Sequence, residues 1–137
     1  MKFARTVFPY AIGLTVLLFF AAVILYQRSS AFLEKGMESE RKGDMVEAIE
    51  SYEWAIQNYT PAINRAGEAI DRLERIATDS EVKGATDTAI EAWQGIVSGL
   101  AVIRHLSQPY PEEKAKAERE MNRLRDRVIA KRNAPSS

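Results

Sequence analysis

The sequence predicts an all-α fold, in which an N-terminal transmembrane helix is followed by an antiparallel stack of helix hairpins and a C-terminal capping helix. Three observations support this prediction. A long stretch near the N-terminus carries no charged residue. The remainder of the chain contains no convincing strand pattern with apolar residues at every second position, and turn-forming residues divide it into amphipathic segments.

The uncharged stretch runs from Thr6 to Gln27 and is rich in Leu, Ile, Val, Phe and Ala. Twenty helical residues rise about 30 Å, the thickness of the hydrocarbon core of a bilayer. Apolar residues go right round the helix axis, whereas a surface helix of a globular protein has a polar face. We therefore expect a transmembrane helix over residues 7–27, after a short basic tail at 1–6.

A cleaved secretory signal is the alternative for this segment. However, the apolar run is longer than the apolar region of a signal peptide, and Arg28 separates it from the small-residue candidate for cleavage, Ser29-Ser30-Ala31. Lys2 and Arg5 favour a cytoplasmic N-terminus. The sequence thus predicts a single-pass signal anchor, which in a bacterium would lie in the inner membrane with the C-terminal domain in the periplasm. Basic residues on the other flank weaken this assignment of orientation: Arg28, Lys35, Arg41 and Lys42.

Composition excludes several functional classes. The 19 basic and 19 acidic residues balance, with an acidic middle (residues 29–111) between two basic ends, so a general polyanion binder is not expected. The chain has no cysteine and one histidine, His105, which excludes thiolate catalysis and most metal sites. We interpret His105 as a polar residue at the end of a helix and the neighbouring carboxylates as solvated helix faces. We therefore expect no enzyme, no cofactor and no nucleic-acid partner.

Turn residues place five helical segments after the apolar run. Gly43-Asp44, Thr60-Pro61, Gly84 and Pro109-Tyr110-Pro111 separate them. Because no helix breaker lies between Tyr26 and Phe32, the first segment should continue the apolar helix. We expect a helical-repeat domain at 28–110, a basic amphipathic helix at 111–133 and a disordered tail at 134–137, with helices at about 30–42, 45–58, 61–79, 86–107 and 111–132.

The chain also resembles itself. When each residue is aligned with the one 41 positions later, seven of the eight pairs compared are identical or aromatic in both copies. This self-similarity indicates a duplicated helix pair. The pairs are Phe32–Leu73, Glu40–Glu81, Lys42–Lys83, Gly43–Gly84, Ala48–Ala89, Ile49–Ile90, Glu50–Glu91 and Tyr52–Trp93.

The first copy resembles the tetratricopeptide repeat. A large residue opens its first helix, small residues stand where two helices must approach closely, an aromatic fills the space between them, and a proline ends the unit. In the second copy Ala77, Ala89 and Trp93 fit, but Ile96 replaces the later alanine, and the offset of 41 exceeds the 34 residues of the family. A plain irregular helical bundle is the alternative. The matching residues of the first copy are Phe32, Gly36, Ala48, Tyr52, Ala55 and Pro61.

The resemblance implies an extended concave face, lined by the helix at 30–42, that binds a peptide or helix. Helical spacing makes Leu33, Met37, Glu40 and Arg41 the candidates for partner binding, and burial or plain solvent exposure is the alternative for all four.

The C-terminal helix has an apolar stripe formed by Ala117, Met121, Leu124, Val128 and Ile129. Helical repeats need such a helix to close the last open face of the stack. Its basic residues could instead engage an acidic protein or anionic lipid headgroups. These residues are Arg119, Arg123, Arg125, Arg127, Lys131 and Arg132.

Together these features predict a non-enzymatic, membrane-anchored interaction scaffold or adaptor that recruits or stabilises a membrane or membrane-adjacent protein complex, with lipid contact through residues 7–27. The alternative is an integral structural subunit of a larger membrane complex. A homo-oligomer formed through Trp54, Trp93 or the C-terminal stripe is compatible with either function.

Overall fold

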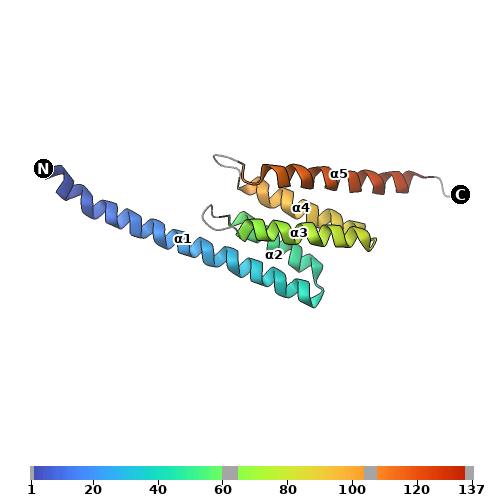
Figure 1. Cartoon of the computed structure of the whole chain (residues 1–137), viewed down its shortest axis with the longest axis horizontal. Helices are drawn as coiled ribbons and strands as arrows, with labels where there is room; N and C mark the ends of the chain where they lie inside the picture. Colours follow the sequence, from blue (N-terminus) through green and yellow to red (C-terminus); the bar gives the residue numbers. More distant parts are fainter. Residues whose placement is uncertain (1, 60–64, 104–107, 135–137) are drawn as a thin grey trace.

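The protein is described by a computed structural model, which covers residues 2–59, 65–103 and 108–134, with side chains in the first helix from Ile12 onward except at positions 25, 26 and 29. The all-α prediction is confirmed. Figure 1 shows a bundle in which the later helices pack against the C-terminal part of the first one, whose N-terminal part extends away. The helices of the described residues are α1 (Lys2–Lys42), α2 (Met45–Gln57), α3 (Arg65–Val82), α4 (Thr86–Val102) and α5 (Pro111–Asn133).

The first helix confirms one expectation and overturns another. As expected, α1 runs without a break from the apolar stretch to Lys42. The transmembrane helix expected over 7–27 is contradicted, because no helix among the described residues is long and apolar enough to cross a membrane.

Helices that follow one another pack together. The C-terminal part of α1 packs on α2, α3 packs on α4, and α5 packs on α4, while α2 also contacts α3 and α4. The core between them consists of aliphatic and aromatic side chains that are almost completely buried. The largest of these are Leu33, Tyr52, Ile56, Ile70, Leu73, Ile96, Leu100 and Leu124.

Two glycines that the 41-residue alignment pairs have the same conformation. Gly43 has a φ of 81° and Gly84 a φ of 76°, in the left-handed region that costs glycine little. Each follows the end of a helix and turns the chain back into the next one, as glycines after helix ends commonly do. This correspondence agrees with a duplicated hairpin, but it does not identify the repeat family, and the tetratricopeptide resemblance stays a prediction.

Small residues allow α1 and α2 to approach closely. A Cβ atom added at Gly36 would lie 2.5 Å from Cε1 of Tyr52, far inside the ordinary carbon–carbon contact distance. Ala48 and Ala55 are fully buried on α2, as is Tyr52 itself. The packing expected for this segment, with an aromatic ring seated against a glycine, is therefore present.

Helix boundaries differ from expectation mainly at α3. This helix continues to Val82, beyond the expected end at 79, because no residue interrupts it before Gly84. The helix α4 ends at Val102, with Ile103 as its C-cap, short of the expected end at 107. The expected start of α3 at 61 and the expected end of α4 at 107 fall on residues 60–64 and 104–107. Those residues, which include Pro61 and His105, lie outside the described part of the chain.

Candidate protein-interaction surfaces

Three of the four residues expected to bind a partner line one hollow. This open groove, of about 770 Å³, lies between α1 and α3, and we call it the α1–α3 groove. Met37, Glu40 and Arg41 contribute to it. Leu33 does not, since it is 1% exposed and belongs to the core, so its assignment to a binding surface was wrong. The lining residues are Ala31, Glu34, Lys35, Met37, Glu38, Glu40, Arg41 and Arg72.

Internal bonds fix one side of this groove. The Tyr52 hydroxyl donates a hydrogen bond of 2.7 Å to Glu40, and Arg72 of α3 lies 3.5 Å from the same carboxylate and also 3.5 Å from the sulfur of Met37. Burial raises the pKa of the Tyr52 hydroxyl, and the bond to Glu40 raises it further, so tyrosine stays protonated and continues to donate. Glu40 and Arg72 are therefore structural partners that join α1 to α3.

The other side of the groove has charges available to a ligand. Glu34 and Arg41 are both exposed and form no ion pair within the described part of the chain. They stand seven residues apart, two turns along one face of α1. An extended or helical segment of a partner could bind there if it placed a basic residue against Glu34 and an acidic residue against Arg41.

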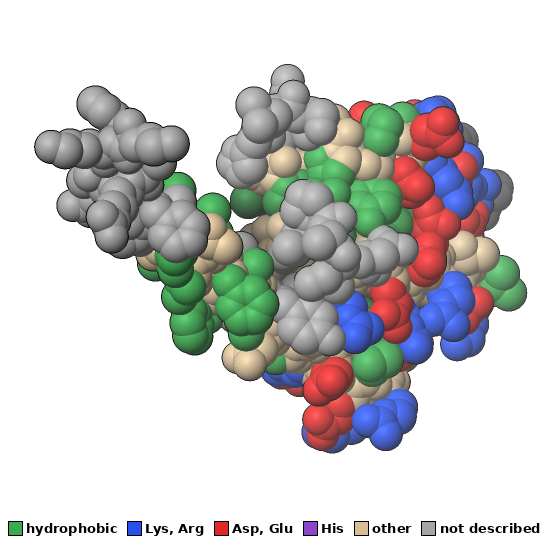
Figure 2. All heavy atoms as spheres, turned by 60° about the vertical axis from the view of Figure 1, so that its left-hand side comes forward, with side chains coloured by type: hydrophobic (Ala, Val, Ile, Leu, Met, Phe, Trp, Pro, Cys, Tyr) green, Lys and Arg blue, Asp and Glu red, His purple; other side chains and the backbone are tan. Residues whose placement is uncertain are grey.

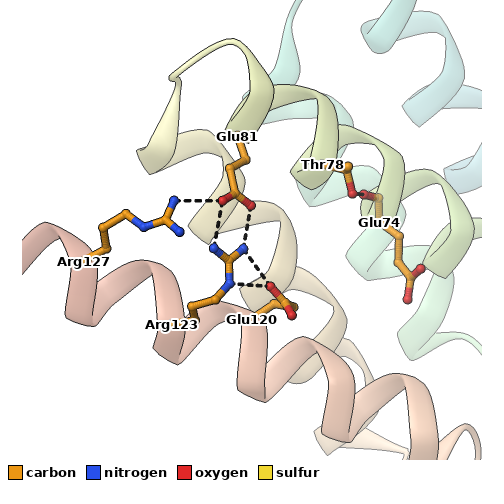
Figure 3. Close-up of polar contacts among 6 residues, drawn as sticks. All are labelled: Glu74, Thr78, Glu81, Glu120, Arg123 and Arg127. Atoms are coloured by element: carbon orange, nitrogen blue, oxygen red, sulfur yellow. Dashed lines mark hydrogen bonds and ion pairs between the residues drawn. The ribbon is translucent and has the colours of Figure 1, made fainter.

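The predicted basic face of α5 is largely engaged inside the chain. Arg123 donates to both carboxylate oxygens of Glu81 on α3, at 2.8 and 2.6 Å, and Arg127 donates to the same carboxylate at 3.0 Å (Figure 3). The Arg123 guanidinium holds the pKa of Glu81 below its usual value. Arg125 donates to Gln94 on α4 at 2.9 Å.

The remaining basic residues, Arg119, Lys131 and Arg132, are exposed and form no ion pair with the residues that the structure describes. The apolar stripe of α5 packs as expected at Ala117 and Leu124, which are buried, whereas Ile129 is mostly exposed. The α5 helix therefore packs on α4 and forms ion pairs with α3. Because these ion pairs use some of its basic residues, the basic surface of α5 is smaller than the sequence predicts.

A long apolar surface lies on the projecting part of α1. Figure 2 shows hydrophobic side chains gathered there, while acidic and basic side chains mix over the bundle. We call this surface, Ile12–Ile24, the apolar segment. Eight of its large side chains are each 48–66% exposed: Ile12, Leu14, Val16, Leu17, Leu18, Phe19, Phe20 and Ile24.

A small hollow of about 430 Å³ lies where α2 ends against α1. Its lining residues are Arg28, Ala31, Phe32, Trp54 and Asn58, and we call it the aromatic hollow. The rings of Phe32 and Trp54 stack with centroids 6.0 Å apart and planes 24° apart, and Trp54 is 45% exposed. The sequence alone shows Trp54 as a large aromatic residue on a predicted helix. It does not show that Phe32 stacks against it.

Among the described residues, no three His, Asp or Glu side chains gather where they could hold a metal ion. Comparison of the chain with protein-family models, curated proteins and solved structures gave no match.

Proposed function

We propose that this chain is a non-enzymatic interaction scaffold that recruits or stabilises another protein. The observation that carries the proposal is the apolar segment, in which eight large side chains are about half exposed or more. Contiguous apolar surface of this kind marks interaction sites, because water disfavours it. Covering one half-exposed Leu- or Phe-sized side chain contributes roughly 1 kcal/mol, so covering all eight contributes on the order of 8 kcal/mol. That sum is comparable with the cost of association, about 4–15 kcal/mol.

The distribution of these side chains indicates how the partner must bind. Successive residues of a helix turn by about 100°, so Leu17, Leu18 and Phe19 point to different sides of α1. A single flat surface covers one side of a helix and leaves the others in water. We therefore propose that the partner encloses the apolar segment, while the bundle and its α1–α3 groove supply further contacts.

The second candidate, a structural subunit of a larger complex, uses the same surfaces but buries the bundle as well. The two candidates differ in what residues 28–137 do alone. A scaffold's bundle folds as a monomer, whereas the bundle of an obligate subunit aggregates or unfolds without its partners. Size-exclusion chromatography and circular dichroism of this fragment separate the two. The location at a membrane stays a prediction, which fractionation of cells tests.

Affinity purification of the full chain from its native cells, in mild detergent, tests the proposal. The unaltered chain is expected to retain one protein in stoichiometric amount. The double variant Leu17→Gln with Phe20→Gln should lose that protein. Val82→Gln is the matched control, because Val82 is 83% exposed on α3. Recovery of the chain with no protein partner, or only with lipid, would refute a protein-binding role for the apolar segment.

A further inference from the structure

Beyond the end of α2, no helix of the described part of the chain covers one face of α1. The helix α2 has 13 residues and α1 has 41, so α2 covers only the C-terminal part of α1. The aromatic hollow marks where this coverage ends, because Trp54 and Asn58 at the end of α2 meet Phe32 and Arg28 of α1. Further toward the N-terminus, α1 continues with no described helix packed on that side (Figure 1).

The face that α2 covers continues as a ridge of apolar side chains. Steps of three and four residues place Leu17, Phe20, Ile24 and Arg28 on the same side of α1 as Phe32. The three apolar members are between 52% and 66% exposed. From Leu17 to Arg28 the ridge rises about 16 Å, a length that roughly three turns of a second helix would cover.

A positive charge stands at the boundary between the ridge and the aromatic hollow. Arg28 is exposed and forms no ion pair with the residues that the structure describes. It is also the first charged residue after the uncharged stretch, and the nearest acid along the helix is Glu34. A carboxylate can bind a guanidinium through two parallel hydrogen bonds, so this position favours an acidic group on whatever covers the ridge.

We infer that the ridge and the aromatic hollow together bind one helix of a partner protein, which lies along α1 in line with α2, presents an apolar face to Leu17, Phe20 and Ile24, and places an Asp or Glu against Arg28. This inference rests on the proposed function and specifies the chemistry of the partner. The exposed edge of Trp54 contacts an apolar side chain near the same end of that helix.

A second copy of this chain does not fit the site as well. In a parallel pair of α1 helices, Arg28 would face Arg28 of the other copy. In an antiparallel pair centred on the ridge, it would face the uncharged stretch, since there is no acidic residue before Glu34. Neither arrangement supplies the carboxylate that Arg28 favours.

Photocrosslinking of the full chain in its native cells tests the inference. A benzophenone-bearing amino acid is introduced at Ile24 or Trp54, and as a control at the distant exposed Val82. Adducts with another protein are expected at the first two positions and not at the third. The crosslinked partner peptide should be helical and should contain an Asp or Glu.

The charge requirement is tested in the same system. Arg28→Lys should keep the adduct, whereas Arg28→Glu should reduce it about tenfold, the factor expected for losing a charge-assisted hydrogen bond. An adduct that does not respond to Arg28→Glu, an adduct of the chain with itself, or crosslinking to lipid alone would overturn the inference.

A probe at Phe19, on the opposite side of α1, separates this inference from the proposed function. Protein adducts at Phe19 without the dependence on Arg28 would overturn the binding mode and leave the scaffold role intact. The absence of protein adducts at both Phe19 and Ile24 would contradict the scaffold role itself.

Discussion

Replacing Gly36 by Ala tests the close approach of α1 and α2. The added Cβ would lie 2.5 Å from Cε1 and 2.7 Å from Cδ1 of Tyr52, whereas carbon atoms pack at about 3.5–4.0 Å. The ring must therefore move by about 1 Å. Tyr52 is fully buried, and its hydroxyl is held by Glu40 at 2.7 Å, so this movement strains the core and weakens that bond.

The expected cost follows from three contributions. Overpacking a core costs about 1–3 kcal/mol, and a weakened hydrogen bond to a charged group costs up to about 1.5–3 kcal/mol. Alanine returns about 1 kcal/mol through its higher helix propensity. We expect Gly36→Ala to lower the free energy of unfolding by about 2 kcal/mol, measured by urea unfolding followed by circular dichroism.

Gly95→Ala is the matched control for this prediction. Its added Cβ would lie 3.4 Å from Cγ2 of Ile49 and 3.5 Å from Cδ1 of Leu73, so the core can accept it with little movement. This variant should be as stable as the unaltered chain or more stable. If Gly36→Ala were equally stable, Tyr52 would have room to move, and the argument that Gly36 sets the distance between α1 and α2 would fail.

Three further predictions concern the polar contacts between helices. Arg123→Gln should lower the free energy of unfolding by about 1 kcal/mol through loss of its bonds to Glu81, whereas Arg119→Gln, on the same helix, should leave the urea midpoint unchanged. Because Arg123 lowers the folded-state pKa of Glu81, the ionised carboxylate stabilises the fold above its unfolded pKa of about 4.3, and this contribution is lost as the pH falls through the lowered folded pKa. The difference in stability between the unaltered chain and Glu81→Gln should therefore be present at neutral pH and disappear in a series of urea titrations at acid pH. Tyr52→Phe should lower the free energy of unfolding by about 1–2 kcal/mol in urea titrations, because it leaves Glu40 without its shortest hydrogen-bond donor.

Local signals predicted most of the fold. Glycine and proline residues indicated where one helix ends and the next begins. Helical periodicity identified the buried side of α5 at Ala117 and Leu124. Such features depend on residues that are close in sequence. The sequence assigned Leu33 to the binding surface because helical spacing places it on the same broad face of α1 as Met37. Spacing does not show that α2 covers one edge of that face, where Leu33 is buried.

Contacts between distant helices could not be read from the sequence. Arg123 and Arg127 looked like a free basic surface, since Glu81 stands 42 and 46 residues away on a helix whose orientation was unknown. The aromatic hollow was missed for the same reason, because Phe32 and Trp54 meet only after α1 and α2 have packed.

The ion pairs between helices extend the 41-residue correspondence beyond the duplicated pair. Glu40, near the end of α1, bonds to Arg72 of α3, and Glu81, the residue 41 positions later in α3, bonds to Arg123 of α5. In each case the acid joins its helix to the next helix but one. The correspondence holds for the two acids and not for their partners, because Arg72 and Arg123 are 51 positions apart. The first helix differs at its other end, where α1 continues past α2 into the apolar segment, so the surface available to a partner is concentrated at the N-terminal side of the bundle.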